Sequence, residues 1–215
     1  MKICIAGLIA YETAQKLYME NKDRILERFP KFFLREFENL SEDMPDPALF
    51  LDKLCIEKNT KKLYSRKNFY FDGKVYIREI TDGGIFSALW AMCEDLEELI
   101  RENKKISVIP EECFKCGHVG CRIELLEIPL DQHVIEILEY LKESPYEVRS
   151  SGSWLIGCEE VPEDMPFLTE IGVITGERSR RIFHGDNSRF LTPPGRQAKD
   201  TEDRKRGLGI DPELM

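Results

Sequence analysis

Runs of apolar residues separated by polar turns divide this chain into strands and helices. Residues 2–10 form an apolar run typical of a buried strand, whereas residues 12–29 and 130–142 carry apolar side chains at helical spacing. Two short runs within residues 68–77, joined by Asp72-Gly73, predict a β-hairpin. Further strands are expected at 74–80, 122–128, 153–158, 170–175 and 180–191, and further helices at 30–40, 48–55 and 85–102. Acidic residues near position 95 predict that the second half of helix 85–102 faces solvent.

The composition then narrows the class of protein. The chain has 215 residues, 42% of them hydrophobic and 33% charged, with a formal net charge of -9. That charge argues against nucleic acid or an anionic membrane as the main partner. The apolar start at residues 3–10 is too short for a membrane span and shows no cleavage pattern for export. Seven cysteines without framework spacing fit reduced thiols, so a cytoplasmic location is expected.

The turn Thr81-Asp82-Gly83-Gly84 joins a predicted strand to a predicted helix. Thr81 or Asp82 can cap that helix, and the glycines allow a ligand to approach the backbone closely. Freed N–H groups at a helix N-terminus form an anion site, which makes phosphate the first ligand to consider. The alternative is an ordinary capped turn, in which Asp82 acts as the N-cap and not as a contact to ligand or metal.

A second polar segment, Ser151-Gly152-Ser153, precedes the predicted strand at 153–158. Its hydroxyl and amide groups can donate to a ligand phosphate. Serines at a strand edge also commonly satisfy nearby backbone groups, and the sequence leaves both interpretations open.

A cluster of four possible metal ligands lies between residues 113 and 121. Cys113, Cys116, His118 and Cys121 offer sulfur and nitrogen donors, and Cys113-x2-Cys116 is a good half-site for zinc or iron. The Cys116-x-His118 spacing is poor, so a second pair of ligands would have to come from elsewhere in the fold. A redox pair of Cys113 with Cys116, or simple free thiols, are the alternatives. Of the other histidines, His133 is expected at the surface, and His184 is expected in a structural role or at the surface.

Several of these segments, taken in order, resemble the C-terminal domain of AIR synthase-related proteins. The matching segments are residues 26–30, 81–90, 127–130, 150–156, 171–172 and 190–195. This superfamily includes aminoimidazole ribonucleotide synthase, the carbamoyl-dehydrating hydrogenase maturation factor, selenophosphate synthetase and thiamine monophosphate kinase. The resemblance implies an α/β (α+β) fold, a three-layer α/β/α sandwich around a mixed sheet, partly ferredoxin-like.

The resemblance also implies a domain layout. Residues 1–192 are expected to form a single domain, with a diverged basic segment near 56–73 and an insertion near 97–118 that contains the cysteine cluster. Residues 193–207 are prolines, glycines and mostly charged or polar side chains that cannot build a core, which predicts that residues 193–215 form a disordered tail. One departure lies in the first strand-to-helix turn, where Ala10-Tyr11-Glu12-Thr13 replaces a segment that carries a glycine in relatives.

Relatives of this kind are two-domain enzymes that use ATP, and their N-terminal domain supplies the aspartates for Mg²⁺. This chain is expected to correspond to the C-terminal domain without that metal-binding half. The favoured hypothesis is a binding or scaffold module that is not active alone and that forms a homo-oligomer. The first alternative is half of an ATP- and Mg²⁺-dependent enzyme, completed by a separately encoded N-terminal-type domain. The second is a zinc- or iron-binding protein that uses Cys113, Cys116 and Cys121.

Overall fold

The computed structural model describes residues 1–40, 69–71, 74–102, 108–161, 165 and 168–194. Its strands are β1 (Lys2–Ala6), β2 (Phe69–Phe71), β3 (Tyr76–Glu79), β4 (Gly120–Glu124), β5 (Trp154–Cys158), β6 (Leu168–Thr175), β7 (Arg180–His184) and β8 (Asn187–Phe190). Its helices are α1 (Tyr11–Glu20), α2 (Lys22–Arg28), α3 (Lys31–Asn39), α5 (Gly84–Arg101), α6 (Glu111–Cys116) and α7 (Gln132–Tyr140), with a 3₁₀ turn, η3, at Leu125–Glu127. The predicted helix at 48–55, most of the basic segment and nearly all of the predicted tail lie outside the described residues.

The described strands form one mixed sheet in the order β2-β3-β5-β1-β6-β4-β7-β8. Neighbouring strands are antiparallel, except that β4 and β7 run parallel. The hairpin predicted at 68–77 is confirmed, because β2 pairs antiparallel with β3. The α+β class and the mixed sheet predicted from the sequence are therefore confirmed.

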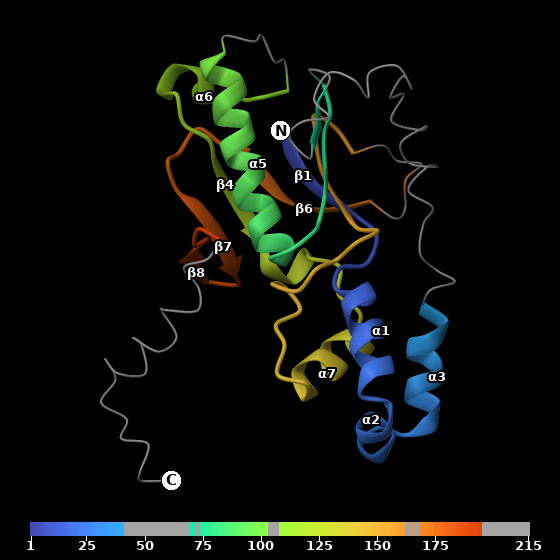
Figure 1. Cartoon of the computed structure of the whole chain (residues 1–215). Coiled ribbons are helices and arrows are strands. Elements are labelled where there is room, and N and C mark those ends of the chain that lie inside the picture. Colours follow the sequence, from blue (N-terminus) through green and yellow to red (C-terminus); the bar gives the residue numbers. More distant parts are fainter. Residues whose placement is uncertain (41–68, 72–73, 103–107, 162–164, 166–167, 195–215) are drawn as a thin grey trace, which may run out of the picture.

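Strand β1 buries both of its faces, as the apolar run at the start of the chain predicts. Ile3 and Ile5 of β1 pack in the largest core cluster with the buried face of α5. Cys4 and Ala6 of the same strand point to the opposite face and pack with Ile156 of β5. Figure 1 shows α5 lying along one face of the sheet.

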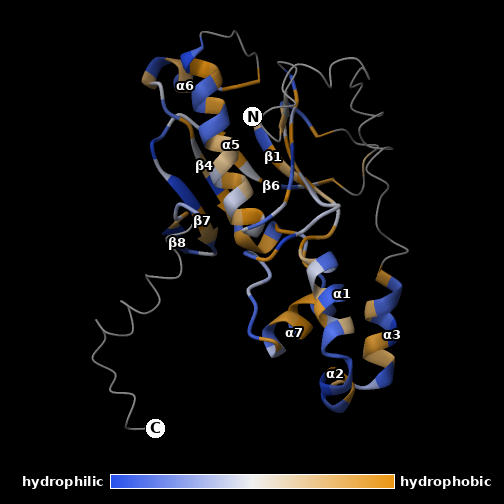
Figure 2. Ribbon diagram, in the orientation of Figure 1, coloured by the Kyte–Doolittle hydropathy of each residue, from blue (hydrophilic) through white to orange (hydrophobic). Residues whose placement is uncertain are grey.

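Four helices form a separate apolar cluster beyond one end of the sheet. Residues of α1, α2, α3 and α7 share this cluster, which Figure 1 shows as a group below the strands. Figure 2 shows that α7 is dominated by apolar residues, and Val134, Ile137 and Leu138 are the buried ones. The predicted helix at 12–29 is divided at Asn21, whose side chain donates to the Leu17 carbonyl and ends α1.

The prediction that the second half of α5 faces solvent is wrong. Leu96 and Leu99 are buried in the main core. Asp95 is drawn inward by Arg78 of β3, whose guanidinium lies 2.6 Å from the Asp95 carboxylate. From sequence alone an acidic residue is expected to be exposed to solvent. Here the ion pair with Arg78, from a distant strand, allows Asp95 to be largely buried.

Candidate functional site

Three turns meet at one end of the sheet and bring together the predicted ligand-binding segments. The first turn follows β1, the second follows β3, and the third precedes β5. Ile80 N–H donates to the Ser153 carbonyl at 2.9 Å, and Ser150 N–H donates to the Ile80 carbonyl at 3.1 Å. Ala10 N–H donates to Ser150 Oγ at 2.7 Å. The structure therefore places Thr81-Asp82-Gly83-Gly84 beside Ser151-Gly152-Ser153, as a site built from both segments requires.

The double glycine in the turn serves internal packing. Gly83 has φ 81° and occupies the N-cap position of α5, which has no side-chain cap. The expectation that Thr81 or Asp82 caps this helix is therefore wrong. Gly84 has φ 63°, and a β-carbon there would overlap the carbonyl oxygens of Tyr146 and Val148. The Gly84 N–H donates to the Thr81 carbonyl at 3.0 Å and is not directed at a ligand.

Asp82 is exposed and its carboxylate pairs with a residue of the neighbouring loop. Arg149 Nη1 lies 3.3 Å from Asp82 Oδ1, and the two side chains are 50% and 86% exposed. Arg149 Nε also donates to Ser151 Oγ at 2.7 Å. A single arginine therefore links the two predicted binding segments, and an exposed pair of this kind contributes little to stability.

The donors of the Ser151-Gly152-Ser153 segment are engaged by groups of the chain itself. Ser151 N–H donates to Glu12 Oε2 at 3.1 Å, and Gly152 N–H lies 3.4 Å from Glu79 Oε1. Ser153 Oγ donates to the Leu8 carbonyl at 2.7 Å. The carboxylates of Glu12 and Glu79 thus accept hydrogen bonds from two of the amide groups that the sequence offers to a ligand phosphate.

The sequence reasoning missed both of these carboxylates, although a signal for each was present. Glu12 lies in Ala10-Tyr11-Glu12-Thr13, the segment that departs from the pattern of relatives, and in the first turn of α1. Glu79 is the last residue of β3, immediately before the Ile80-Thr81 turn. A cleft of about 230 Å³ borders the same turn, and Glu79, Asp82 and Arg78 supply its charged side chains. Arg78 is paired with Asp95, and Asp82 is paired with Arg149.

The three cysteines among the four predicted metal ligands have different hydrogen-bond partners. Cys113 is buried on α6 and its Sγ donates to the Thr175 carbonyl at 3.4 Å, whereas the exposed Cys116 donates to the Gly176 carbonyl at 3.0 Å. Cys121 lies on β4. A hydrogen bond between the free thiols of Cys121 and Cys93, together with burial, raises the pKa of Cys93. Burial, with a smaller effect of Cys116, raises the pKa of Cys113 to about 11, so this thiol is protonated at neutral pH. Among the residues that the structure describes, no three potential ligands gather into a metal cluster.

His133 is not the surface residue that the sequence suggests. Its side chain is 20% exposed and bridges α7 to α3. Nδ1 lies 2.8 Å from Asp131 Oδ1 and Nε2 lies 3.2 Å from Glu36 Oε2. Partial burial disfavours the charged imidazole, but these hydrogen bonds outweigh it and raise the pKa of His133. His184 is exposed at the end of β7, as expected.

The geometry defines an α+β domain with strand-to-helix turns at one end of a mixed sheet. No known protein-family model matches the sequence, and no curated protein matches it. The fold does match solved structures of HypE, a hydrogenase maturation protein. The match to E. coli HypE has a TM-score of 0.53 and 12% identity, covering 90% of this chain and 50% of that one. The match to HypE in complex with ATP has a TM-score of 0.51 and 13% identity, covering 89% and 50%.

The chain therefore has the fold of HypE over about half of the length of that protein. The AIR synthase-related resemblance noted in the sequence is confirmed at the level of fold. Within the described part of the chain, no helix is long and apolar enough to cross a membrane.

Proposed function

We propose that this chain is a non-catalytic binding module built on a HypE-like fold. The observation that carries the proposal is the engagement of Ser151 and Gly152 N–H groups by the carboxylates of Glu12 and Glu79. A phosphate would have to displace these carboxylates and would then lie beside them. Each pair of like charges at about 4 Å costs about 1 kcal/mol even in water and more where water is excluded.

The charge of the adjoining cleft supports the same conclusion. Glu79 and Asp82 contribute two carboxylates, and the guanidinium of Arg78 is turned toward Asp95. Enzymes that transfer phosphoryl groups neutralise the phosphate oxygens with metal ions and cationic side chains. Both nearby arginines are engaged, Arg78 by Asp95 and Arg149 by Asp82, so the described side chains around this turn offer a phosphate no uncommitted cation, which suits a binding role without nucleotide chemistry.

The alternative is half of an ATP-dependent enzyme that is completed by a separate N-terminal-type domain. One observation favours it: a HypE structure that this fold matches was solved in complex with ATP, and this chain spans about half of that protein. Under this alternative ATP and Mg²⁺ bind once the partner domain is present. A non-catalytic binding module, in contrast, shows no nucleotide affinity either alone or together with an N-terminal-type domain.

Thermal-shift measurements with ATP, ADP and inorganic phosphate, each with Mg²⁺, test the proposal. A nucleotide at about 100 times its dissociation constant stabilises the native state by about 2.7 kcal/mol. For a chain of this size that corresponds to about 5–10 °C. We expect no shift beyond that of sodium chloride at matched ionic strength. A saturable shift with Mg·ATP, for the chain alone or with an N-terminal-type domain, would refute the non-catalytic proposal.

A matched pair of variants locates any anion binding. Glu12→Ala together with Glu79→Ala frees the two N–H groups, so this double variant should gain a phosphate-dependent shift that the wild-type chain lacks. Glu20→Ala with Glu38→Ala removes the same charge from α1 and α3 and serves as the control. If the wild-type chain already responds as strongly as the double variant, the carboxylates do not exclude the anion.

We also propose that the module self-associates. Large apolar side chains are exposed on the helical cluster, including Met19 and Phe32 at 62% and 64%. Light scattering during size-exclusion chromatography measures the molar mass directly. A monomer at all concentrations would refute self-association without affecting the binding proposal.

A further inference from the structure

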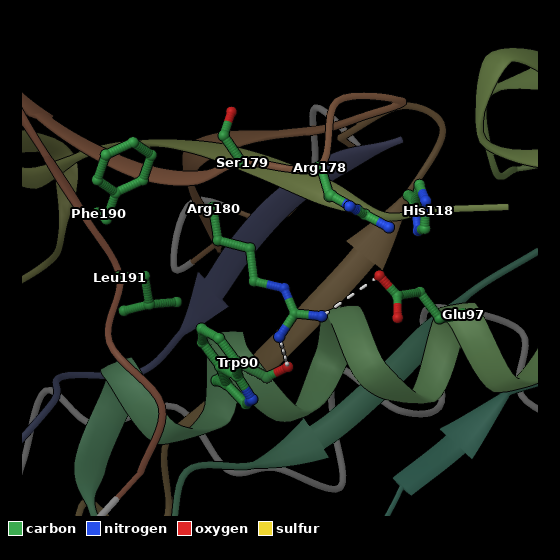
Figure 3. Close-up of a pocket in the computed structure, with 8 residues that line it drawn as sticks. All are labelled: Trp90, Glu97, His118, Arg178, Ser179, Arg180, Phe190 and Leu191. Carbon is green, nitrogen blue, oxygen red and sulfur yellow. Dashed lines mark hydrogen bonds and ion pairs between the residues drawn. The ribbon is translucent and has the colours of Figure 1, made fainter. Parts of the chain in front are cut away.

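The two faces of the sheet differ in how the described residues cover them. On the face that α5 covers, Arg180 of β7 points toward Trp90 and Glu97 of that helix, as Figure 3 shows. Successive residues of a strand point to opposite faces, so Arg181 and Phe183 lie on the other side of β7. The apolar cluster on that other side contains strand and loop residues and none from a described helix.

The strand register places four residues in one row across this second face. Val173 of β6 lies opposite Arg122 of β4, and Arg122 lies opposite Arg181 of β7. Arg181 in turn lies opposite Phe190 of β8. Phe190 is 65% exposed and Val173 is 37% exposed. The row therefore has an exposed apolar residue at each end and two arginines between them.

A second row runs beside the first, two residues further along β4 and β7. Glu124 lies opposite Phe183, and Phe183 lies opposite Ser188. The guanidinium of Arg122 lies 4.4 Å from the centroid of the Phe183 ring, and that of Arg181 lies 5.7 Å from it. The first row is therefore cationic, whereas the second row offers a carboxylate and an aromatic ring.

The charges of these two rows are not paired within the described part of the chain. Like charges directly opposite each other in a sheet are destabilising, and Arg122 and Arg181 are such a pair. The side chains of Arg122 and Glu124 form no hydrogen bond or ion pair with any described residue. Arg181 Nη2 donates to the uncharged Ser188 Oγ at 2.6 Å, and Arg181 Nε is buried without a described partner. A carboxylate supplied by another molecule would relieve the repulsion between the arginines.

A second copy of the chain can supply that carboxylate. A two-fold axis that runs across the strands, in the plane of the face and between the two rows, exchanges one row for the other. Arg122 of each copy then faces Glu124 of the other, and Arg181 of each copy faces the Phe183 ring of the other. An axis along the strands would instead bring the arginines of the two copies together, which is unfavourable. The charge pattern therefore selects one arrangement of two copies.

We propose that the open face of β6, β4, β7 and β8 is the two-fold interface of a homodimer, with reciprocal ion pairs between Arg122 and Glu124. The dimer also covers Phe190 and Val173. This inference rests on the self-association proposed above and goes beyond it, because it assigns the contact to a sheet face separate from the helical cluster and fixes the orientation of the two copies.

The size of the face predicts a reversible dimer. Four strands about 4.8 Å apart, each about five residues long, present a flat area of roughly 300 Å². Stable interfaces bury about 800 Å² on each partner, and smaller ones belong to weak complexes. We therefore expect the dimer to form at high protein concentration and to dissociate on dilution.

Reversing the charge at two exposed positions tests the arrangement. Arg122→Glu and Glu124→Arg each place like charges at both symmetry-related contacts, so each variant alone should weaken the dimer by roughly tenfold or more. An equimolar mixture of the two variants should recover wild-type association, because the mixed dimer again pairs opposite charges at both contacts. Sedimentation equilibrium from micromolar to millimolar concentration measures each dissociation constant. A mixture that associates as weakly as its components, with both variants keeping the wild-type melting temperature, would overturn the inference.

Matched variants in the helical cluster provide the controls. Lys16→Glu and Glu20→Lys reverse the two exposed charges of an ion pair on α1 and should leave the dimer unchanged. An equal loss in these variants would show that the effect of charge is non-specific. Phe32→Ser removes an exposed apolar side chain of α3. If Phe32→Ser abolishes association and Arg122→Glu does not, the helical cluster is the interface and the sheet face is not.

Further outcomes separate this inference from the proposed function. Phe190→Ser changes no charge and should also weaken the dimer, so it gives an independent test if a charge variant fails to fold. A wild-type chain that is monomeric throughout refutes both the sheet-face dimer and self-association, but not the non-catalytic role, which the nucleotide titration tests. Binding of polyglutamate to such a monomer, lost in Arg122→Glu, would assign the face to an acidic partner instead of a second copy.

Discussion

Arg78 of β3 and Asp95 of α5 form an ion pair whose Nη2 and Oδ2 atoms lie 2.6 Å apart. Both side chains are largely buried, at 15% and 14% exposure, and Tyr76 OH donates to the same Asp95 oxygen at 2.7 Å. The pair joins the sheet to the helix that covers it. It also explains how an acidic residue can lie in the packed second half of α5.

Removing one partner of this pair should be strongly destabilising. In Asp95→Asn the buried guanidinium of Arg78 loses its counter-charge, and we expect unfolding to become easier by about 3–5 kcal/mol. Tyr76→Phe removes two hydrogen bonds, the one that Tyr76 OH donates to Asp95 and the one that it accepts from Arg78 Nε, and should cost about 2 kcal/mol. Urea denaturation monitored by circular dichroism measures both. Equal small losses in the two variants would mean that the ion pair adds nothing beyond an ordinary hydrogen bond.

Gly84→Ala should destabilise the chain far more than Gly152→Ala. Both glycines have positive φ, so each substitution carries the left-handed backbone cost of about 1–2 kcal/mol. At Gly84 the added methyl also overlaps the Tyr146 and Val148 carbonyls, whereas at Gly152 it meets nothing within 4 Å. We therefore expect a total loss of about 3 kcal/mol or more for Gly84→Ala. Similar melting temperatures for the two variants would refute a packing role for Gly84.

Stability should depend on the protonation of His133. Its pKa is raised in the folded state by Asp131 and Glu36, against the opposing effect of burial. A raised pKa means that the native state holds the proton more tightly than the unfolded chain. The stabilisation is therefore complete below the unfolded pKa of about 6.5 and is lost as the pH rises through the folded value. Melting temperatures of wild type and His133→Gln should converge above that range, and a difference independent of pH would contradict the assignment.

The cysteine cluster should not yield a stoichiometric metal site of its own. Cys113 and Cys116 donate to different carbonyls, and the thiol of Cys121 is hydrogen-bonded to that of Cys93. We expect elemental analysis of protein grown with added zinc to find well under one zinc or iron per chain, with no change in Cys113→Ser or Cys116→Ser. One metal per chain that both variants lose would restore the metal-binding hypothesis.

Much of the fold could be predicted because its signals are local. The apolar run of β1, the Asp72-Gly73 hairpin and the amphipathic spacing of α5 and α7 follow from residues close in sequence. Predictions failed where a distant group changed the meaning of a residue. The sequence predicts that Asp95 is exposed to solvent, but the ion pair with Arg78 allows it to be buried. It also predicts that His133 is exposed, but the contact with Glu36 of α3 holds it between two helices.

The candidate site follows the same division. Neighbouring residues suffice to predict that a helix starts at Thr81-Asp82-Gly83-Gly84 and that serines precede β5, because turn chemistry is local. The engagement of the loop's donors by Glu12 and Glu79 depends on the folded chain, since the bonded residues are separated by 139 and 73 positions. Long-range pairing also places the Arg180 guanidinium 4.1 Å from the centroid of the Trp90 ring. Contacts of this kind depend on how the strands order themselves in the sheet, and no local pattern records that order.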